Sequence, residues 1–221
     1  MRKFFGLSVA LVIIAIFVAG CGTPPPLKSD KYLQDTSLLA SDGPCTTPCF
    51  HDIVPGKTTF TDAVTTLKAD KAFSNVQTQD KPPQAGWSTA AGEDCCQVTA
   101  DQDSGLVNAL LVKVAPTMTL QQVIEKYGAP KYVYTVDYTA DEVAVAVIFP
   151  DKGLVTWVSP GNDQSNLDGT SKVVIVLYIN PTDWEKVLDT ATLQAWNGFQ
   201  SYQSYKNSTP VVTPKVTPTA G

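Results

Sequence analysis

One internal similarity constrains the fold of this chain more than any other feature of its sequence. Residues 59–67 and residues 119–127 follow the same order of polar and apolar positions, 60 residues apart. Each segment begins with a threonine, which suits the N-cap of a helix, and continues with apolar residues at helical spacing. Residues 182–205 begin in a similar way after a proline. The pattern therefore predicts three helices, the last of which closes the fold.

Short segments rich in β-branched residues separate these helices and are typical of strands. They are residues 73–77, 87–90, 96–100 and 106–114 in the first interval, and 132–137, 143–149, 154–158 and 172–179 in the second. Turn residues between them favour antiparallel hairpins. We therefore expect an α+β fold of two tandem helix-plus-antiparallel-sheet repeats, about 51–116 and 117–181, with a C-terminal helix packed on the sheet.

The N-terminus has the layout of an export signal. Arg2 and Lys3 precede an apolar run from Phe4 to Ala19, which ends in Val-Ala-Gly before Cys21. The run is 16 residues long, whereas a membrane-spanning helix needs about 20. Its four-residue ending resembles the lipobox of bacterial lipoproteins. That resemblance implies removal of residues 1–20, a diacylglycerol on Cys21, and a lipid-anchored chain on the extracytoplasmic side of the cell membrane.

The remaining chain divides by composition into three parts. Residues 21–43 are rich in proline and polar residues, and we expect them to form a linker. Residues 44–205 carry the helix and strand patterns and form the predicted domain. Residues 206–221 are rich in threonine and proline and have no apolar periodicity, so we expect a disordered tail.

Charge limits the class of partner. Removal of residues 1–20 leaves 14 basic and 21 acidic side chains, a formal charge of −7. A negative chain without a basic stripe does not suit nucleic acid and gains nothing from anionic lipid headgroups. We therefore expect the chain to meet the membrane only through its N-terminal lipid, and to have no nucleic-acid partner.

Four cysteines remain after Cys21: Cys45, Cys49, Cys95 and Cys96. In an oxidising compartment an even number of cysteines favours disulfides, and four allow three pairings. We expect at least one bridge between the 45/49 pair and the 95/96 pair. Bridging both Cys95 and Cys96 to the 45–49 segment would demand a bulge or a chain end there, since adjacent strand residues point to opposite faces. A bond between the two neighbours in sequence is the less favoured alternative.

These cysteines also give the alternative function. His51, the single histidine, lies near Cys45 and Cys49, and thiolates with an imidazole are ligands for copper or zinc. A metal-delivery or thiol-redox lipoprotein built on them is therefore a second hypothesis. The copper-delivery lipoproteins that this segment resembles have a thioredoxin fold, and the order of predicted helices and strands here differs. We predict no metal site and no cofactor.

Residues 119–130 carry a second resemblance. This run, TLQQVIEKYGAP, resembles the helix and Gly-x-Pro ending of the SmpA/OmlA outer-membrane assembly lipoproteins and of the two-repeat β-lactamase-inhibitor-like proteins. The resemblance implies a capped helix paired with an antiparallel sheet. The first repeat departs from it, with Ala69-Asp70 in place of the Gly-x-Pro.

The sequence favours a non-catalytic function. There is no Gly-x-Ser-x-Gly nucleophile motif to use the single histidine, so we expect no enzyme. Tyr132, Tyr134 and Tyr138 alternate along one predicted strand and its end, and aromatic side chains are frequent anchors of interfaces. We expect a binding or envelope-assembly module that holds another envelope protein, with these tyrosines as the contact surface.

Overall fold

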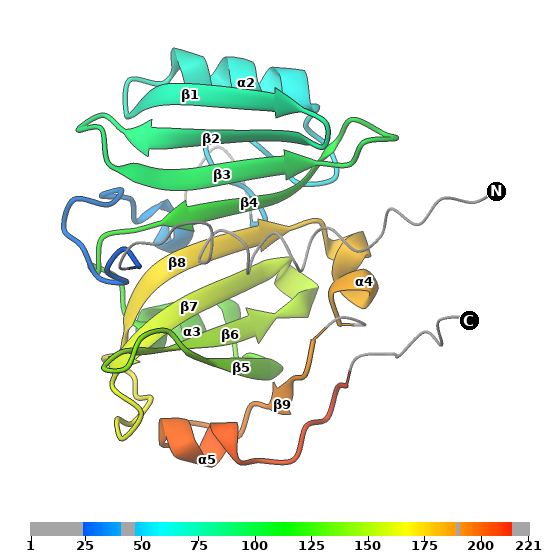
Figure 1. Cartoon of the computed structure of the whole chain (residues 1–221). Coiled ribbons are helices and arrows are strands. Elements are labelled where there is room, and N and C mark those ends of the chain that lie inside the picture. Colours follow the sequence, from blue (N-terminus) through cyan, green and yellow to red (C-terminus); the bar gives the residue numbers. More distant parts are fainter. Residues whose placement is uncertain (1–23, 41–46, 189–190, 214–221) are drawn as a thin grey trace, which may run out of the picture.

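The computed structural model of this chain describes residues 24–40, 47–188 and 191–213, and its centre is one nine-stranded sheet (Figure 1). The strand order is β1-β2-β3-β4-β8-β7-β6-β5-β9, and all neighbouring strands are antiparallel. The strands are β1 (Phe73–Asp80), β2 (Pro83–Thr89), β3 (Asp94–Ala100), β4 (Val107–Lys113), β5 (Tyr132–Asp137), β6 (Val143–Phe149), β7 (Leu154–Gly161), β8 (Lys172–Ile179) and β9 (Gln194–Ala195).

The helices are short. They are η1 (Ser37–Leu39), α2 (Phe60–Ala69), α3 (Leu120–Tyr127), η2 (Pro150–Lys152), η3 (Pro181–Asp183), α4 (Trp184–Leu188) and α5 (Tyr202–Lys206). The first two predicted helices are confirmed as α2 and α3. The Thr59 hydroxyl accepts the amide of Asp62 at the start of α2, and Thr119 with Gln122 forms a capping box on α3. No helix in the described part of the chain is long and apolar enough to cross a membrane.

The predicted fold class, two helix-plus-sheet repeats with a closing helix, is wrong. β4 and β8 pair antiparallel, from Ala109 opposite Ile179 to Lys113 opposite Ile175, and this pair joins all nine strands into one sheet. Both strands are almost continuously apolar. A strand of this kind at an open edge exposes unpaired backbone groups and apolar side chains, so the two edges are stable only when they pair.

The closing helix predicted over residues 182–205 is also wrong. The described residues there form α4, the two-residue strand β9 and α5. Gly198, between β9 and α5, has a φ of 86°, which a right-handed helix does not allow. β9 pairs with Tyr132 and Val133, and so a very short strand covers the edge at β5.

The two faces of the sheet are covered differently. On one, here called the helix face, α2 and α3 bury their apolar sides through Leu67, Leu120 and Val123. On the other, here called the groove face, Leu27, Trp184 and Leu193 pack over β5–β8. This cluster includes Ala109 and Leu111 of β4, whereas no described residue of β1, β2 or β3 belongs to it.

Residues 24–40, most of the predicted linker, pack against the domain. Leu27, Tyr32, Leu33 and Leu38 are buried. Leu33 forms a parallel bridge with Val114 at the end of β4. The apolar residues in this proline-rich stretch therefore belong to the core.

Candidate functional site

A groove of about 510 Å³ lies along the uncovered part of the groove face, over β1–β4. Its volume is in the range of small-molecule binding sites. Five carboxamide side chains line it: Asn75, Gln77, Gln79, Gln84 and Gln97. These side chains place hydrogen-bond donors and acceptors along the lining, which suits a ligand with polar groups.

Strand register explains why these side chains meet. Gln77 lies opposite Gly86, Gly86 opposite Gln97, and Gln97 opposite Leu111. Directly paired residues of neighbouring strands point to the same face. Because Gly86 has no side chain, it leaves a gap in the middle of this row. The backbone at the bottom of this gap forms the floor of the groove.

Hydrogen bonds fix the carboxamides relative to one another. The amide nitrogen of Gln97 donates to the oxygen of Gln84 (3.1 Å), and that of Gln84 donates to the oxygen of Gln79 (2.9 Å). Gln77 donates in the same way to Asn75 (2.9 Å). A carboxamide has two N–H donors and two acceptor positions. Within the described residues this chain uses one of each on Gln84, and the others are free to meet a ligand.

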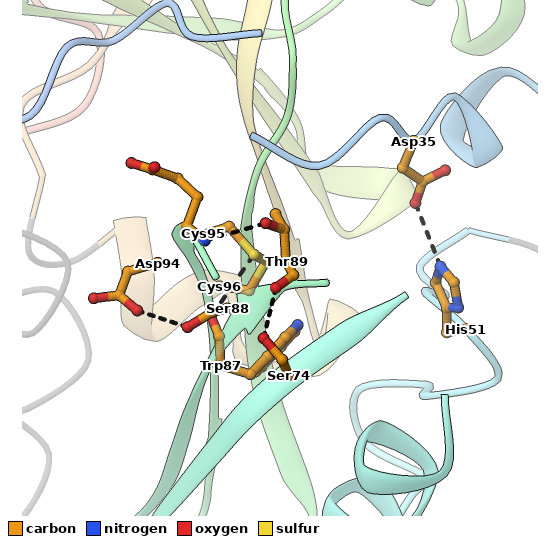
Figure 2. The surroundings of a disulfide bond; sticks show 10 residues. Asp35, His51, Ser74, Trp87, Ser88, Thr89, Asp94, Cys95 and Cys96 are labelled. Atoms are coloured by element: carbon orange, nitrogen blue, oxygen red, sulfur yellow. Dashed lines mark hydrogen bonds and ion pairs between the residues drawn. A yellow bond between two sulfur atoms is a disulfide. The ribbon is translucent and has the colours of Figure 1, made fainter. Parts of the chain in front are cut away.

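A disulfide between the neighbours Cys95 and Cys96 lies at one end of the groove (Figure 2). The predicted bridge from this pair to Cys45 or Cys49 is wrong, because these two sulfurs are bonded to each other. The pairing of β2 with β3 shows how this is possible. Trp87 lies opposite Cys96 and Ser88 opposite Asp94, so Cys95 is the extra residue of a β-bulge. The bulge breaks the alternation that otherwise sends neighbouring side chains to opposite faces.

Among the described residues, the charged side chains that line the groove are Asp94 and Lys113, which lie at this end. The Ser88 hydroxyl donates to Asp94 (2.7 Å), as Figure 2 shows. Lys113 lies 5.3 Å from the centroid of the Tyr32 ring, in a cation–π arrangement. Burial lowers the pKa of Lys113, although the nearby carboxylates of Asp94 and Glu93 oppose this shift.

His51 lies away from the groove, between two carboxylates. Its Nδ1 is 2.6 Å from Asp70 and its Nε2 is 3.6 Å from Asp35. His51 and Asp52 have φ values of 46° and 64°, and Phe50 and Ile53 exchange both backbone hydrogen bonds around them. This is the geometry of a type I′ turn, and it directs the imidazole toward the carboxylates.

The three side chains connect three separate segments. Asp35 precedes η1 and accepts the amide of Ser37 (2.6 Å), and Asp70 is the C-cap of α2. Pairing with Asp35, together with Asp70, raises the pKa of His51 against the effect of burial. Burial acts to raise the pKa of Asp35, but the hydrogen bonds from His51 and Ser37 outweigh it and lower that pKa. We call Asp35, His51 and Asp70 the histidine clamp.

The metal hypothesis requires free cysteine thiolates close to the His51 imidazole, and the described residues do not form such a cluster. Cys49, Cys95 and Cys96 are all in disulfides, and both nitrogens of His51 face carboxylates. No group of three or more His, Cys, Asp and Glu side chains in residues 24–40, 47–188 and 191–213 is arranged to hold a metal ion. Cys21 and Cys45 lie outside the described residues.

The predicted tyrosine surface is half-buried. Tyr132, Tyr134 and Tyr138 all pack against the apolar cluster of the groove face, over β5–β8. Tyr134 meets Trp157 edge to face at 6.2 Å, and the Tyr138 hydroxyl donates to the carbonyl of Pro25. The three side chains therefore share a face, as predicted, and part of each contributes to packing.

Comparisons of the chain with protein-family models, with curated proteins and with solved structures gave no match. The assignment of function therefore depends on the site itself. The sequence analysis missed the groove, although one signal for it is present. Gln77 and Gln79 alternate within one segment that forms a strand, with single glutamines at 84 and 97 in the next two, and period-two polar residues mark one face of a sheet.

Proposed function

We propose that this chain is a lipid-anchored, extracytoplasmic binding module without catalytic activity, and that it holds another envelope component in the groove over β1–β4. One observation carries the proposal. The groove face is covered over β4–β8 by an apolar cluster that includes Leu27, Trp184 and Leu193, whereas over β1–β3 it presents carboxamide groups that are hydrogen-bonded to one another. Polar groups held in place by neighbours bind with a smaller loss of side-chain entropy than free ones.

The surroundings of the single histidine support a non-catalytic function. A general base needs a free nitrogen within reach of a substrate proton. Both ring nitrogens of His51 are directed at carboxylates, and the ring packs between Phe50 and Phe73 at 4.5 and 4.9 Å. The imidazole is therefore suited to holding segments together.

Three measurements in cells that make the native protein test this proposal. Mass spectrometry should find an acylated N-terminal cysteine, and a Cys21→Ser variant should leave the membrane fraction. A photo-crosslinking residue at Gln97, in the groove, should capture an envelope component. The same residue at Gln102, in the exposed turn after β3, is the matched control and should capture none.

An unmodified Cys21 in membrane-bound native protein contradicts the anchoring. Equal crosslinking from both positions, or none from either, contradicts the groove as the binding face.

A further inference from the structure

On the basis of the proposed function, we infer that the ligand of the groove is a neutral saccharide chain. The inference names the chemical class of the envelope component and rests on three features of the groove: the chemistry of its donors and acceptors, its charge, and the shape of its floor.

Hydrogen-bonding chemistry is the first feature. Each carboxamide offers donors and acceptors side by side, and a sugar hydroxyl also donates and accepts. Gln79, Gln84 and Gln97 lie on three successive strands, and the hydrogen bonds between them set the direction of each amide plane. A row of fixed, uncharged amides matches a row of hydroxyl or acetamide groups along an oligosaccharide. An acyl chain would leave these donors and acceptors without partners, at a cost for every group desolvated.

Charge is the second feature. Charged side chains line only one end of the groove, where Asp94 and Lys113 have opposite signs. The whole chain has a formal charge of −5. Lys113 is the one basic side chain that lines the groove within the described residues, and Asp94 lies at the same end, so a chain with an anionic group on every unit has no matching row of cations to compensate its desolvation. A neutral ligand therefore fits and a polyanion does not.

The floor is the third feature. A Cβ added at Gly86 meets only the carbonyl oxygen of Cys96, at 3.7 Å, an ordinary contact distance. The backbone at Gly86 therefore accepts a side chain without strain. The open space above Gly86 is part of the groove. Leu111, two strands away in the same row, is buried in the apolar cluster of the groove face, so the accessible groups around the gap are the amides. A pyranose ring placed over Gly86 has its hydroxyls within reach of these amides.

Calorimetric titration of the purified full-length chain in detergent tests the inference. The probes are chitohexaose and cellohexaose, two neutral chains with and without acetamide groups, and hexagalacturonate, a chain of similar length with a carboxylate on every ring. We expect at least one neutral hexamer to bind and hexagalacturonate not to bind. Binding of neither neutral hexamer, or equal binding of the charged one, overturns the inference.

Variants locate the binding. Gly86→Leu fills the floor and should weaken binding at least tenfold, whereas Gly86→Ala leaves room and should stay within threefold of the parent. Gln97→Met removes one amide with little change of shape and should also weaken binding about tenfold, with Gln102→Met as the control outside the groove. Unchanged binding in Gln97→Met overturns the inference even if Gly86→Leu fails to fold.

The saccharide inference and the proposed function fail separately. Crosslinking of a protein from Gln97, without binding of any hexamer, retains the binding module and overturns the saccharide. Binding of a neutral hexamer by a chain whose Cys21 is never acylated retains the saccharide and overturns the anchor.

Discussion

Replacement of His51 by asparagine should destabilise the protein in a pH-dependent way. The variant removes the cation of the histidine clamp and leaves Asp35 and Asp70 beside a neutral side chain. Asparagine is chosen because it tolerates the positive φ of 46° at this position. The comparison therefore measures the loss of charge and hydrogen bonding, with little added backbone strain.

The magnitude follows from the exposure of the clamp. The side chains of His51, Asp70 and Asp35 are 29%, 27% and 14% exposed, so the clamp lies between a surface pair and a buried one. A hydrogen bond to a charged group at such a site contributes about 2 kcal/mol. For a chain of this size that loss lowers the Tm by about 4–8 °C.

The sign of the pH dependence follows from the two pKa shifts. The pKa of His51 is raised above its unfolded value of about 6.5. Its contribution to stability is therefore complete below that pH and is lost as the pH rises through the folded pKa. The pKa of Asp35 is lowered, so its contribution is present above about pH 4 and is lost as the pH falls through its folded pKa. The clamp should contribute most between about pH 4 and 6.5.

Urea denaturation at pH 5.5 and pH 9 measures the effect. The difference in unfolding free energy between the parent and His51→Asn should be about 2 kcal/mol at pH 5.5 and less than half of that at pH 9. Lys186→Ala, which removes the exposed ion pair with Asp183, is the control and should change stability by less than about 0.5 kcal/mol at either pH. A His51→Asn effect of equal size at both pH values would refute the reasoning.

Three further predictions concern the core, a helix cap and the disulfide. Leu110→Ala in β4, where the side chain is fully buried, should cost about 2–5 kcal/mol in urea denaturation, and a cost below about 1 kcal/mol would contradict the packing. Thr119→Ala removes half of the capping box on α3 and should cost about 1 kcal/mol by thermal unfolding, while Thr117→Ala, just before the cap, should have little effect. The Cys95–Cys96 bond closes no long loop in the unfolded chain, so its removal in a Cys95→Ser/Cys96→Ser variant, which keeps the disulfide of Cys49, should lower the Tm by only a few degrees, and loss of cooperative unfolding in that variant would contradict this.

Local features of the fold could be predicted from the sequence, because they depend on residues close in the chain. The strands β5, β6 and β8 match the predicted residues 132–137, 143–149 and 172–179. α2 and α3 begin where threonine caps were expected. Alternation, turn residues and caps act over a few positions and need no knowledge of the partner strand.

The features that were missed depend on contacts between distant segments. The pairing of β4 with β8 joins residues more than 60 positions apart, and no local pattern shows which edge meets which. The bond between Cys95 and Cys96 depends on a bulge that forms only when β3 pairs with β2. The groove depends on the register that places Gly86 between Gln77 and Gln97.

The burial of Leu27 limits how far the domain stands from the membrane. With a lipid on Cys21, as proposed, five residues lie between the anchor and this packed side chain, a span of six residue-to-residue steps. Fully extended, they reach about 20 Å, close to the radius of gyration of about 16 Å expected for a globular chain of this size. If the anchor is present, a linker this short would restrict rotation of the domain. It would hold the end of the sheet near Pro25 and Tyr138 toward the headgroups, and a ligand would then have to approach within the layer next to the bilayer.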